Sequence, residues 1–576
     1  MGEIWILNLK PLLLKIKFLV LSIHSEEEEM KSVASLLLEH LKAFGVSHVF
    51  GIPGKAISPI VLEADRQGLQ YVLCRHEAGA GFASAGFALG SGKIGVALGT
   101  SGPGGTNMLT AAGQAKAFNL PVLFITGQPA IGKTGKGLGQ DSSIFGTDLV
   151  KMFEPVTLFS ARVERSDLFP IYFQHALEKM YGSSKGPVHL SLPFDVSMEK
   201  INTFKLDMPK GSILLSPEID RILSMIKEAK CPVLVVGKGV HASRAYEEVL
   251  SLAEKAHIPV MTTPGGKGSF PTNNPLSLGG FGLAASEEAY DFLRKGCDLM
   301  ITLGTKLSDM SLAGVTVDMY PQQMIQFDCD PTFIGKSLPV PTLAVVGDLK
   351  ANLRELLRKL PLFSNRPLIA GAKREIDTPK VDKESTLISA AHTIKILRKC
   401  LPEDTIVISD DGSHAFYGVK YFEVVKPGTF YFDDVFGAMG HAIGMAIGVK
   451  IAQPKRHVVC ITGDGCLMMQ GTEISTAVCN KVPAIFVVIN NGRLDMVEKA
   501  MKFGGDRVVG AIYEVPLHAA QFSQSLGATS FRCQKEEEIE AALIFALQHD
   551  GPTVIEVIVD PDEIPPTLSR EKIDKQ

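Results

Sequence analysis

The sequence predicts an α/β fold of three doubly wound domains, each built on a parallel sheet that helices cover. The first observation is that helical stretches, short apolar strands and glycine loops alternate along the chain, which is typical of parallel sheets. The second is that two polar, proline-containing stretches, about 202–216 and 362–386, interrupt this alternation as linkers would. The third is the length, because 576 residues accommodate three such domains.

The first predicted domain, 30–200, opens with a helix. Its apolar residues recur at helical spacing over 31–44. Short apolar runs bounded by glycine or polar residues then indicate strands. These strands are expected over 46–50, 95–98, 122–125 and 188–192.

The second and third predicted domains, 216–361 and 385–565, repeat the alternation of strand and helix. The second begins with an apolar strand over 232–236. No repeat of 20–50 residues is visible, which excludes a solenoid. In the third domain, strands are expected over 405–409, 458–461, 484–489 and 553–559.

Composition excludes several classes of protein. The chain has 58 basic and 62 acidic residues and a net charge of −4, which argues against a nucleic-acid-binding protein. With 45% hydrophobic and 21% charged residues, it is globular rather than disordered. Its nine cysteines include no C-x-x-C pair, so neither a disulfide framework nor a zinc site is expected. A reducing, cytoplasmic location follows as the prediction.

Residues 1–29 stand apart as a leader. The apolar stretch 5–23 contains Lys10, Lys15 and Lys17, so it is not the uninterrupted run of about 20 apolar residues that a membrane span needs. Four glutamates, 26–29, then precede Met30. Because glutamate codons are purine-rich, we expect this run to be a translated ribosome-binding site and Met30 to be the true start. An amphipathic membrane anchor is the alternative.

The clearest motif lies at two strand ends in the third domain. The strand 457–462 leads into Gly463-Asp464-Gly465, and the next strand, 484–489, ends at Asn490-Asn491. The carboxyl ends of parallel strands lie on one edge of the sheet, so Asp464 and Asn491 should face one point. Their oxygens suit Mg²⁺, and the glycine N–H groups suit phosphates. The alternative is a pair of ordinary turns.

A second motif, Arg75-His76-Glu77, precedes the small-residue helix that starts at Ala78-Gly79-Ala80-Gly81. Alone, it could be a surface pair of arginine and glutamate. Together with the Gly463-Asp464-Gly465 and Asn490-Asn491 segments, it resembles the thiamine diphosphate enzymes, and in particular the large subunits of acetohydroxyacid (acetolactate) synthases. The resemblance extends from Met30 to about residue 560.

The resemblance implies a role for each motif and each domain. In the family, the glutamate at Glu77 activates the aminopyrimidine of thiamine diphosphate, while Asp464, Asn491 and the carbonyl of Arg493 hold Mg²⁺. The resemblance also implies that the first domain binds the pyrimidine of the cofactor, that the second is the central domain, and that the third binds the diphosphate. An active-site glutamine matches Gln140. The cofactor-binding residues carried over from the family are Gly51, Pro53, Gly102, Pro103, Ser413, His414, Gly437, Met439, Gly463, Asp464, Gly465 and Cys466.

The resemblance also implies an activity. The expected reaction is decarboxylation of a 2-oxo acid, with pyruvate as the expected substrate, and carboligation to a second carbonyl, as in branched-chain amino acid biosynthesis. A homodimer or homotetramer with active sites between subunits is implied, with a regulatory subunit as a further partner and no nucleic acid or membrane. Whether the central domain binds FAD stays open. The alternatives are another 2-oxo acid decarboxylase or carboligase with a different substrate pair, and a non-catalytic assembly partner.

The substrate-facing positions depart from the synthase pattern. Gln140 is preceded by Gly139 instead of the usual phenylalanine, and an arginine that holds the second substrate aligns with Lys306. Lysine cannot form the bidentate pair of hydrogen bonds that arginine makes with a carboxylate. A tryptophan that selects the acceptor aligns with Ala500. The cofactor residues therefore match the family better than the substrate residues do.

Overall fold

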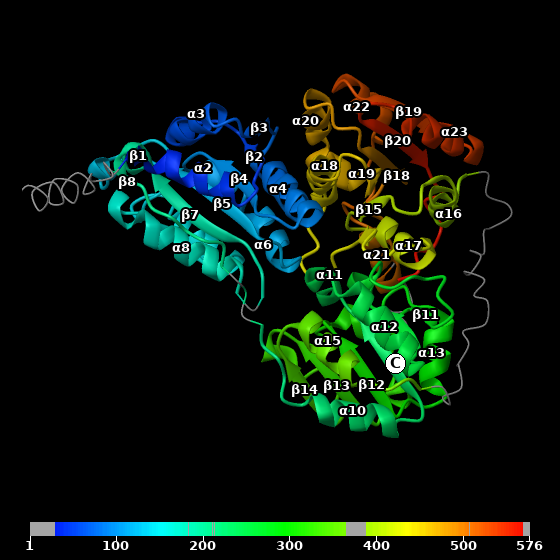
Figure 1. Ribbon diagram of the computed structural model, residues 1–576. Helices are drawn as coiled ribbons and strands as arrows, with labels where there is room; N and C mark the ends of the chain where they lie inside the picture. The colour runs from blue at the N-terminus through cyan, green and yellow to red at the C-terminus, as the bar shows by residue number, and fades with distance from the viewer. Residues whose placement is uncertain are drawn as a thin grey trace, which may run out of the picture.

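The computed structural model describes residues 29–363, apart from 183, 210 and 212, and residues 387–567, apart from 506. Within these ranges the chain forms three six-stranded sheets, whose strands are all parallel, together with helices that cover them (Figure 1). The predicted fold class is therefore confirmed. The predicted leader, 1–29, lies outside the described residues except for Glu29.

The first sheet has the strand order β3-β2-β4-β5-β7-β6. Its strands are β2 (His48–Gly51), β3 (Gln70–Leu73), β4 (Gly95–Gly99), β5 (Val122–Gln128), β6 (Ser160–Arg162) and β7 (Val188–Pro193). The main helices are α2 (Val33–Ala43), α3 (Ser58–Arg66), α4 (Glu77–Ser91), α6 (Leu109–Ala117) and α8 (Phe169–Met180). A short antiparallel pair, β1 (Met30–Ser32) and β8 (Lys200–Asn202), closes this domain.

The C-terminal sheet has the order β16-β15-β17-β18-β20-β19. In chain order this is second, first, third, fourth, sixth and fifth, the same arrangement as in the first sheet. Its strands are β15 (Ile406–Ser409), β16 (Phe430–Tyr431), β17 (Val458–Gly463), β18 (Ile485–Asn490), β19 (Thr529–Cys533) and β20 (Thr553–Ile558). Its helices include α16 (Ala390–Cys400), α17 (Ser413–Tyr421), α18 (His441–Ala452), α19 (Asp464–Gln470), α20 (Ile474–Cys479) and α21 (Asp495–Gly504).

The central sheet has a different order, β11-β10-β9-β12-β13-β14. Strand order reverses between β9 and β12, and ligands of such sheets bind outside the strand ends at that reversal. Its strands are β9 (Pro232–Val236), β10 (Val260–Thr262), β11 (Ser277–Gly280), β12 (Leu299–Leu303), β13 (Gln323–Asp328) and β14 (Thr342–Val346). Its helices include α10 (Ile219–Glu228), α11 (Gly239–Ser243), α12 (Tyr246–Ala256), α13 (Glu287–Arg294) and α15 (Leu349–Lys359).

Helices α4 and α18 pack directly against each other and join the first and third domains. Both are rich in glycine and alanine, which lets their backbones approach closely. A side chain at Gly448 would collide with the carbonyl oxygen of Ala83, and one at Gly86 with that of Met445. The small-residue helix that the sequence predicts after Glu77 therefore serves close helix packing. Among the described residues, no helix combines the length and apolar character that a membrane crossing requires.

Candidate active site

The structure brings the two predicted metal ligands to one edge of the C-terminal sheet. Strands β17 and β18 are adjacent and parallel, with Gly463 opposite Ile489. Asp464 follows β17, and its Oδ1 accepts a hydrogen bond from the backbone N–H of Gly465 at 2.9 Å. Its Oδ2 accepts one from the N–H of Gly492 at 2.8 Å, in the loop that follows β18. The Asp464 carboxylate therefore joins the two loops.

The chemistry of this edge fits a divalent cation. Asp464 is buried, and burial raises its pKa to about 6, against the opposing effect of the backbone N–H groups that bond it. A buried carboxylate is stabilised by a nearby cation. The amide of Asn491 and the backbone carbonyl of Arg493 are further oxygen donors in the same loop, and oxygen donors are what Mg²⁺ prefers. The Arg493 side chain itself is engaged in ion pairs with Glu498 and Asp562.

Three glycine-containing loops meet beside Asp464 and form a cradle. A Cβ added at Gly463 would lie 2.9 Å from Nδ1 of His414, and one at Gly465 would lie 3.3 Å from Cε of Met439. Cys466 donates its Sγ–H to the carbonyl oxygen of Asp411 at 3.1 Å. Asp411 lies two residues before the first residue of α17. The structure therefore gathers the predicted residues of segments 412–414, 437–440 and 463–466 at one place.

His414 supplies the test of whether a diphosphate fits this cradle. Burial lowers its pKa to about 4, and its Nε2 is buried without a hydrogen-bond partner among the described residues. A buried polar atom without a partner is costly, so a ligand atom is the natural partner. Ser413 begins α17, where backbone N–H groups favour an anion. These groups fit a diphosphate bound next to Asp464.

The loop 437–440, which carries the predicted cofactor residues Gly437 and Met439, has an unusual backbone conformation at two glycines. Gly437 has φ 68° and Gly440 has φ 90°, both in the left-handed region that favours glycine. Met439 lies between them, with its Cε toward Gly465. These left-handed conformations explain why glycine occupies both positions.

Glu77 is the first residue of α4 and is buried, so the alternative of a surface pair with Arg75 is wrong. Its Oε2 accepts a hydrogen bond from Nδ2 of Asn107 at 2.9 Å. The preceding segment is fixed by Glu473, whose Oε1 accepts from the N–H groups of Arg75 at 3.0 Å and His76 at 2.8 Å. Glu473 belongs to the third domain, so this contact anchors the start of α4 there. Sequence reasoning missed Glu473, because no local pattern distinguishes it.

The predicted loops of the first domain lie together at the ends of its strands. Gly51 ends β2, where a side chain would collide with the carbonyl oxygen of Leu98. Gly102 donates its N–H to Oγ of Ser142 at 2.7 Å, and a Cβ added there would lie 3.2 Å from Cβ of Gln140. Gln140 has φ 56° and is exposed. The structure thus places Gln140 beside Gly102, while Pro53 and Pro103 are exposed in the same loops.

Lys306 lies in the loop that follows β12 of the central domain. Its ammonium nitrogen lies 4.7 Å from the centre of the Phe333 ring, a cation–π contact. Within the described residues, no hydrogen bond or ion pair joins Lys306 to Gln140. The substrate roles of these two residues therefore stay predictions.

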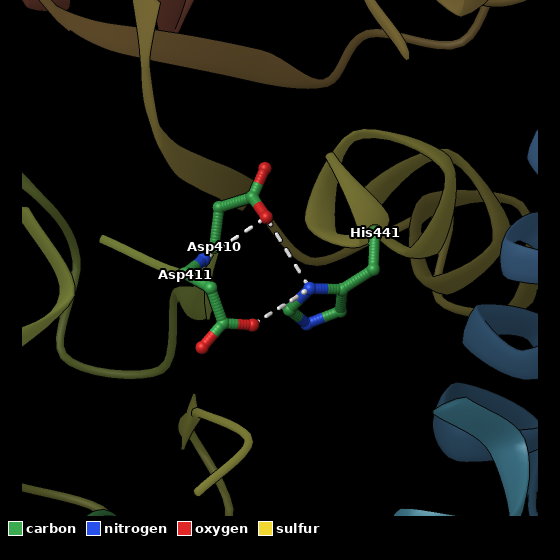
Figure 2. Close-up of side chains that lie close together, drawn as sticks. All are labelled: Asp410, Asp411 and His441. Carbon is green, nitrogen blue, oxygen red and sulfur yellow. Dashed lines mark hydrogen bonds and ion pairs between the residues drawn. The ribbon is translucent and has the colours of Figure 1, made fainter. Parts of the chain in front are cut away.

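A buried cluster that the sequence did not reveal lies beside the loop 437–440, which carries Met439. Figure 2 shows Nδ1 of His441 facing the carboxylates of Asp410 and Asp411, at 3.2 and 3.5 Å. Although burial lowers the pKa of His441, Asp410 and Asp411 raise it to about 9. The same Nδ1 lies 2.8 Å from the carbonyl oxygen of Ala438, so it carries a proton and donates it. His441 and Asp410 therefore form a buried ion pair, in a group whose residue types would also suit a metal ion.

Asp410 connects this ion pair to the cofactor loop. Its Oδ1 accepts from the N–H of Gly440 at 2.8 Å, and its Oδ2 accepts from Oγ1 of Thr462 at 2.9 Å. Residues 438–441 are thereby held against the ends of β15 and β17. The His441–Asp410 pair fixes the backbone on which Met439 stands.

Replacing His441 by glutamine should make the free energy of unfolding less dependent on pH. The folded-state pKa of about 9 lies above the ordinary value of 6.5, so the charged His441 stabilises the fold below pH 6.5. This contribution is lost as the pH rises through 9. Urea unfolding at pH 7 and at about pH 10 should show a smaller loss of stability in H441Q than in the wild type. An equal loss in both proteins would contradict the charged state assigned to His441.

Comparisons with known proteins agree with this geometry. The thiamine pyrophosphate enzyme N-terminal TPP binding domain matches residues 31–149, the central domain matches 219–356, and the C-terminal TPP binding domain matches 410–557. Thiamine pyrophosphate is another name for thiamine diphosphate. These three matches follow the order of the three sheets along the chain.

Whole-length relatives point to the same family. The chain is 31% identical over 557 residues to the probable acetolactate synthase large subunit of Methanocaldococcus jannaschii, covering 93% of each chain. It is 30% identical over 561 residues to the acetolactate synthase large subunit of Corynebacterium glutamicum, covering 93% of this chain and 88% of that one. It is 30% identical over 545 residues to the putative thiamine pyrophosphate-containing protein YdaP of Bacillus subtilis, covering 92% of each. The chain therefore belongs to the family of thiamine pyrophosphate enzymes that includes the acetolactate synthase large subunits.

Proposed function

We propose that the protein is a thiamine diphosphate- and Mg²⁺-dependent enzyme that decarboxylates a 2-oxo acid and joins the remaining fragment to a second carbonyl, as an acetolactate synthase does. The observation that carries this proposal is the convergence of Asp464, His414 and Met439 at one edge of the C-terminal sheet. Family membership supports it, because whole-length relatives are named acetolactate synthase large subunits.

The cofactor, when bound, supplies the nucleophile and the electron sink for decarboxylation. Asp464, Asn491 and the carbonyl of Arg493 would hold Mg²⁺, and His414 and the glycine N–H groups would hold the diphosphate. Asn107 orients the carboxyl group of Glu77 through Oε2, which leaves Oε1 to exchange a proton with the aminopyrimidine. Glu77 is buried, so water has little access to this carboxyl group.

Pyruvate is the proposed substrate, with Gln140 as the residue that meets it in the first domain. A different substrate pair is the second candidate, because Gly139, Lys306 and Ala500 depart from the synthase pattern. The relative named only as a putative thiamine pyrophosphate-containing protein is about as similar as the named synthases, which keeps this candidate open.

Flavin is not part of the proposed mechanism. The order of the central sheet would suit a dinucleotide between β9 and β12, but the loops after these strands are in contact. A Cβ added at Gly239 would lie 2.7 Å from Cα of Gly304, and Lys238 is engaged in an ion pair with Asp433 at 2.8 Å. FAD is therefore not assigned to the central domain, and the absorption spectrum of the purified protein decides whether it binds.

The assembly and location remain proposals drawn from the family resemblance. We infer a homodimer or homotetramer in which active sites form between subunits, a regulatory subunit as a further partner, and a cytoplasmic location. Within one chain, α4 packs against α18, so the first and third domains are in close contact.

A panel of 2-oxo acids with identification of the products tests the proposed function. With pyruvate, thiamine diphosphate and Mg²⁺, we expect acetolactate as the main product. Acetaldehyde alone, or turnover only with another 2-oxo acid, would favour the second candidate. The absorption spectrum of the same preparation shows whether the central domain binds FAD, because bound flavin gives a characteristic band.

A further inference from the structure

The segment 433–440 of the C-terminal domain lies where all three domains meet. It carries Gly437 and Met439, two of the predicted cofactor residues. Lys238 reaches it from the central domain, immediately before α11, and Gln114 reaches it from α6 of the first domain. Figure 1 shows α6 and α11 at this junction.

The carboxylate of Asp433 is the centre of the junction. It is fully buried and accepts hydrogen bonds from both neighbouring domains and from its own loop. Its Oδ1 accepts from Nζ of Lys238 at 2.8 Å and from the N–H of Val435 at 3.2 Å. Its Oδ2 accepts from Nε2 of Gln114 at 2.8 Å and from the N–H groups of Phe436 at 2.9 Å and Gly437 at 3.1 Å.

Gln114 and Lys238 each make a second contact with the same region. The Oε1 of Gln114 accepts from the N–H of Ala438 at 3.2 Å, so one amide bonds both Asp433 and the following loop. Lys238 also lies 3.4 Å from Asp434, whose Oδ2 accepts from the N–H of Gly265 in the central domain. The two side chains therefore contact Asp433, Asp434 and Ala438, which lie on both sides of Gly437.

Burial makes these contacts strong constraints. The side chain of Asp433 is 0% exposed and that of Lys238 is 13% exposed, so neither charge is well solvated without the other. Burial opposes ionisation of both groups, but their mutual attraction holds the pKa of Asp433 well below its usual range and raises that of Lys238. A network with all its members satisfied fixes one conformation of the loop.

We propose that Lys238 and Gln114 are positioning residues of the cofactor site, which hold Asp433 and thereby the backbone of Gly437 and Ala438 in the conformation that receives thiamine diphosphate. The inference rests on the proposed function and adds to it a role for the central domain in cofactor affinity. Neither residue touches the reacting atoms, so neither is a catalytic residue.

Calorimetric titration of thiamine diphosphate at saturating Mg²⁺ tests this role. We expect K238M to weaken cofactor binding by about tenfold or more, and K238R to recover most of the affinity because it keeps the charge. The KM for the 2-oxo acid should change little, since the contacts lie on the cofactor loop. The matched control is K350M, which removes a lysine of the same domain that pairs with Glu248 at 3.7 Å.

A second variant covers a failure of K238M to fold. The double variant K238M/D433N removes both buried charges, and it too should bind thiamine diphosphate about tenfold or more weakly. Wild-type affinity in a folded K238M or double variant, or the same loss in K350M, would overturn the inference and leave the proposed function intact. Absence of binding by the wild-type protein would overturn both.

Discussion

Replacing Glu77 by glutamine should lower kcat by roughly 10²- to 10⁴-fold, the range that a positioned general acid or base contributes. Glutamine keeps the size of the side chain and its hydrogen bond with Asn107 but cannot exchange a proton. The affinity for thiamine diphosphate should stay within about threefold of the wild type, because the diphosphate and Mg²⁺ contacts lie in the other domain. Steady-state kinetics with saturating cofactor measures the first value, and calorimetry measures the second.

The matched control for this prediction is E473Q. Glu473 is also a buried glutamate near the start of α4, but its carboxylate bonds the backbone N–H groups of Arg75 and His76 and has no proposed role toward the cofactor. Its replacement should mainly lower the free energy of unfolding, and it should lower kcat less than E77Q does. Full turnover by E77Q, or an equal loss of kcat in E473Q, would remove the assigned role from Glu77.

Replacing Asp464 by asparagine should raise the Mg²⁺ concentration needed for half-maximal activity by at least about 100-fold, since loss of a residue that merely supports a ligand already costs 10- to 100-fold. Asparagine keeps one oxygen and the shape of the side chain, but it removes the negative charge that binds the cation. Activity titrated with Mg²⁺ at fixed thiamine diphosphate gives the measurement.

D495N is the control for the metal site. Asp495 is a buried aspartate of the same domain, begins α21 and pairs with Lys499. Its replacement should leave the Mg²⁺ requirement near the wild-type value. If D464N needs no more Mg²⁺ than D495N, Asp464 is not a metal ligand.

Much of the fold is predictable from local patterns. Strands β17 and β18 were expected over 458–461 and 484–489 and span Val458–Gly463 and Ile485–Asn490, because buried parallel strands are short apolar runs bounded by polar residues. The strand β16 was not expected, and it has only two residues at the edge of its sheet. Edge strands bury fewer side chains, so their sequences carry a weaker pattern.

The candidate site likewise contains residues that the sequence predicts and residues that it does not. Asp464 and Asn491 are predictable because sheet geometry places successive strand ends on one edge. The contacts of Asp433 are not, since Lys238 and Gln114 are 195 and 319 residues away in the sequence. His441 also has no distinguishing spacing, and its charge depends on Asp410 and Asp411, which only the folded chain brings beside it. Side chains paired across domains leave no local signal.

Titration of the wild-type protein with thiamine diphosphate, with and without Mg²⁺, is the most direct test of a cofactor site built on Asp464, His414 and Met439. We predict saturable binding of one cofactor per chain in the presence of Mg²⁺, and loss of that binding when a chelator removes the metal. Absence of binding, or binding with the same affinity in the presence of the chelator, would contradict the site described for this chain.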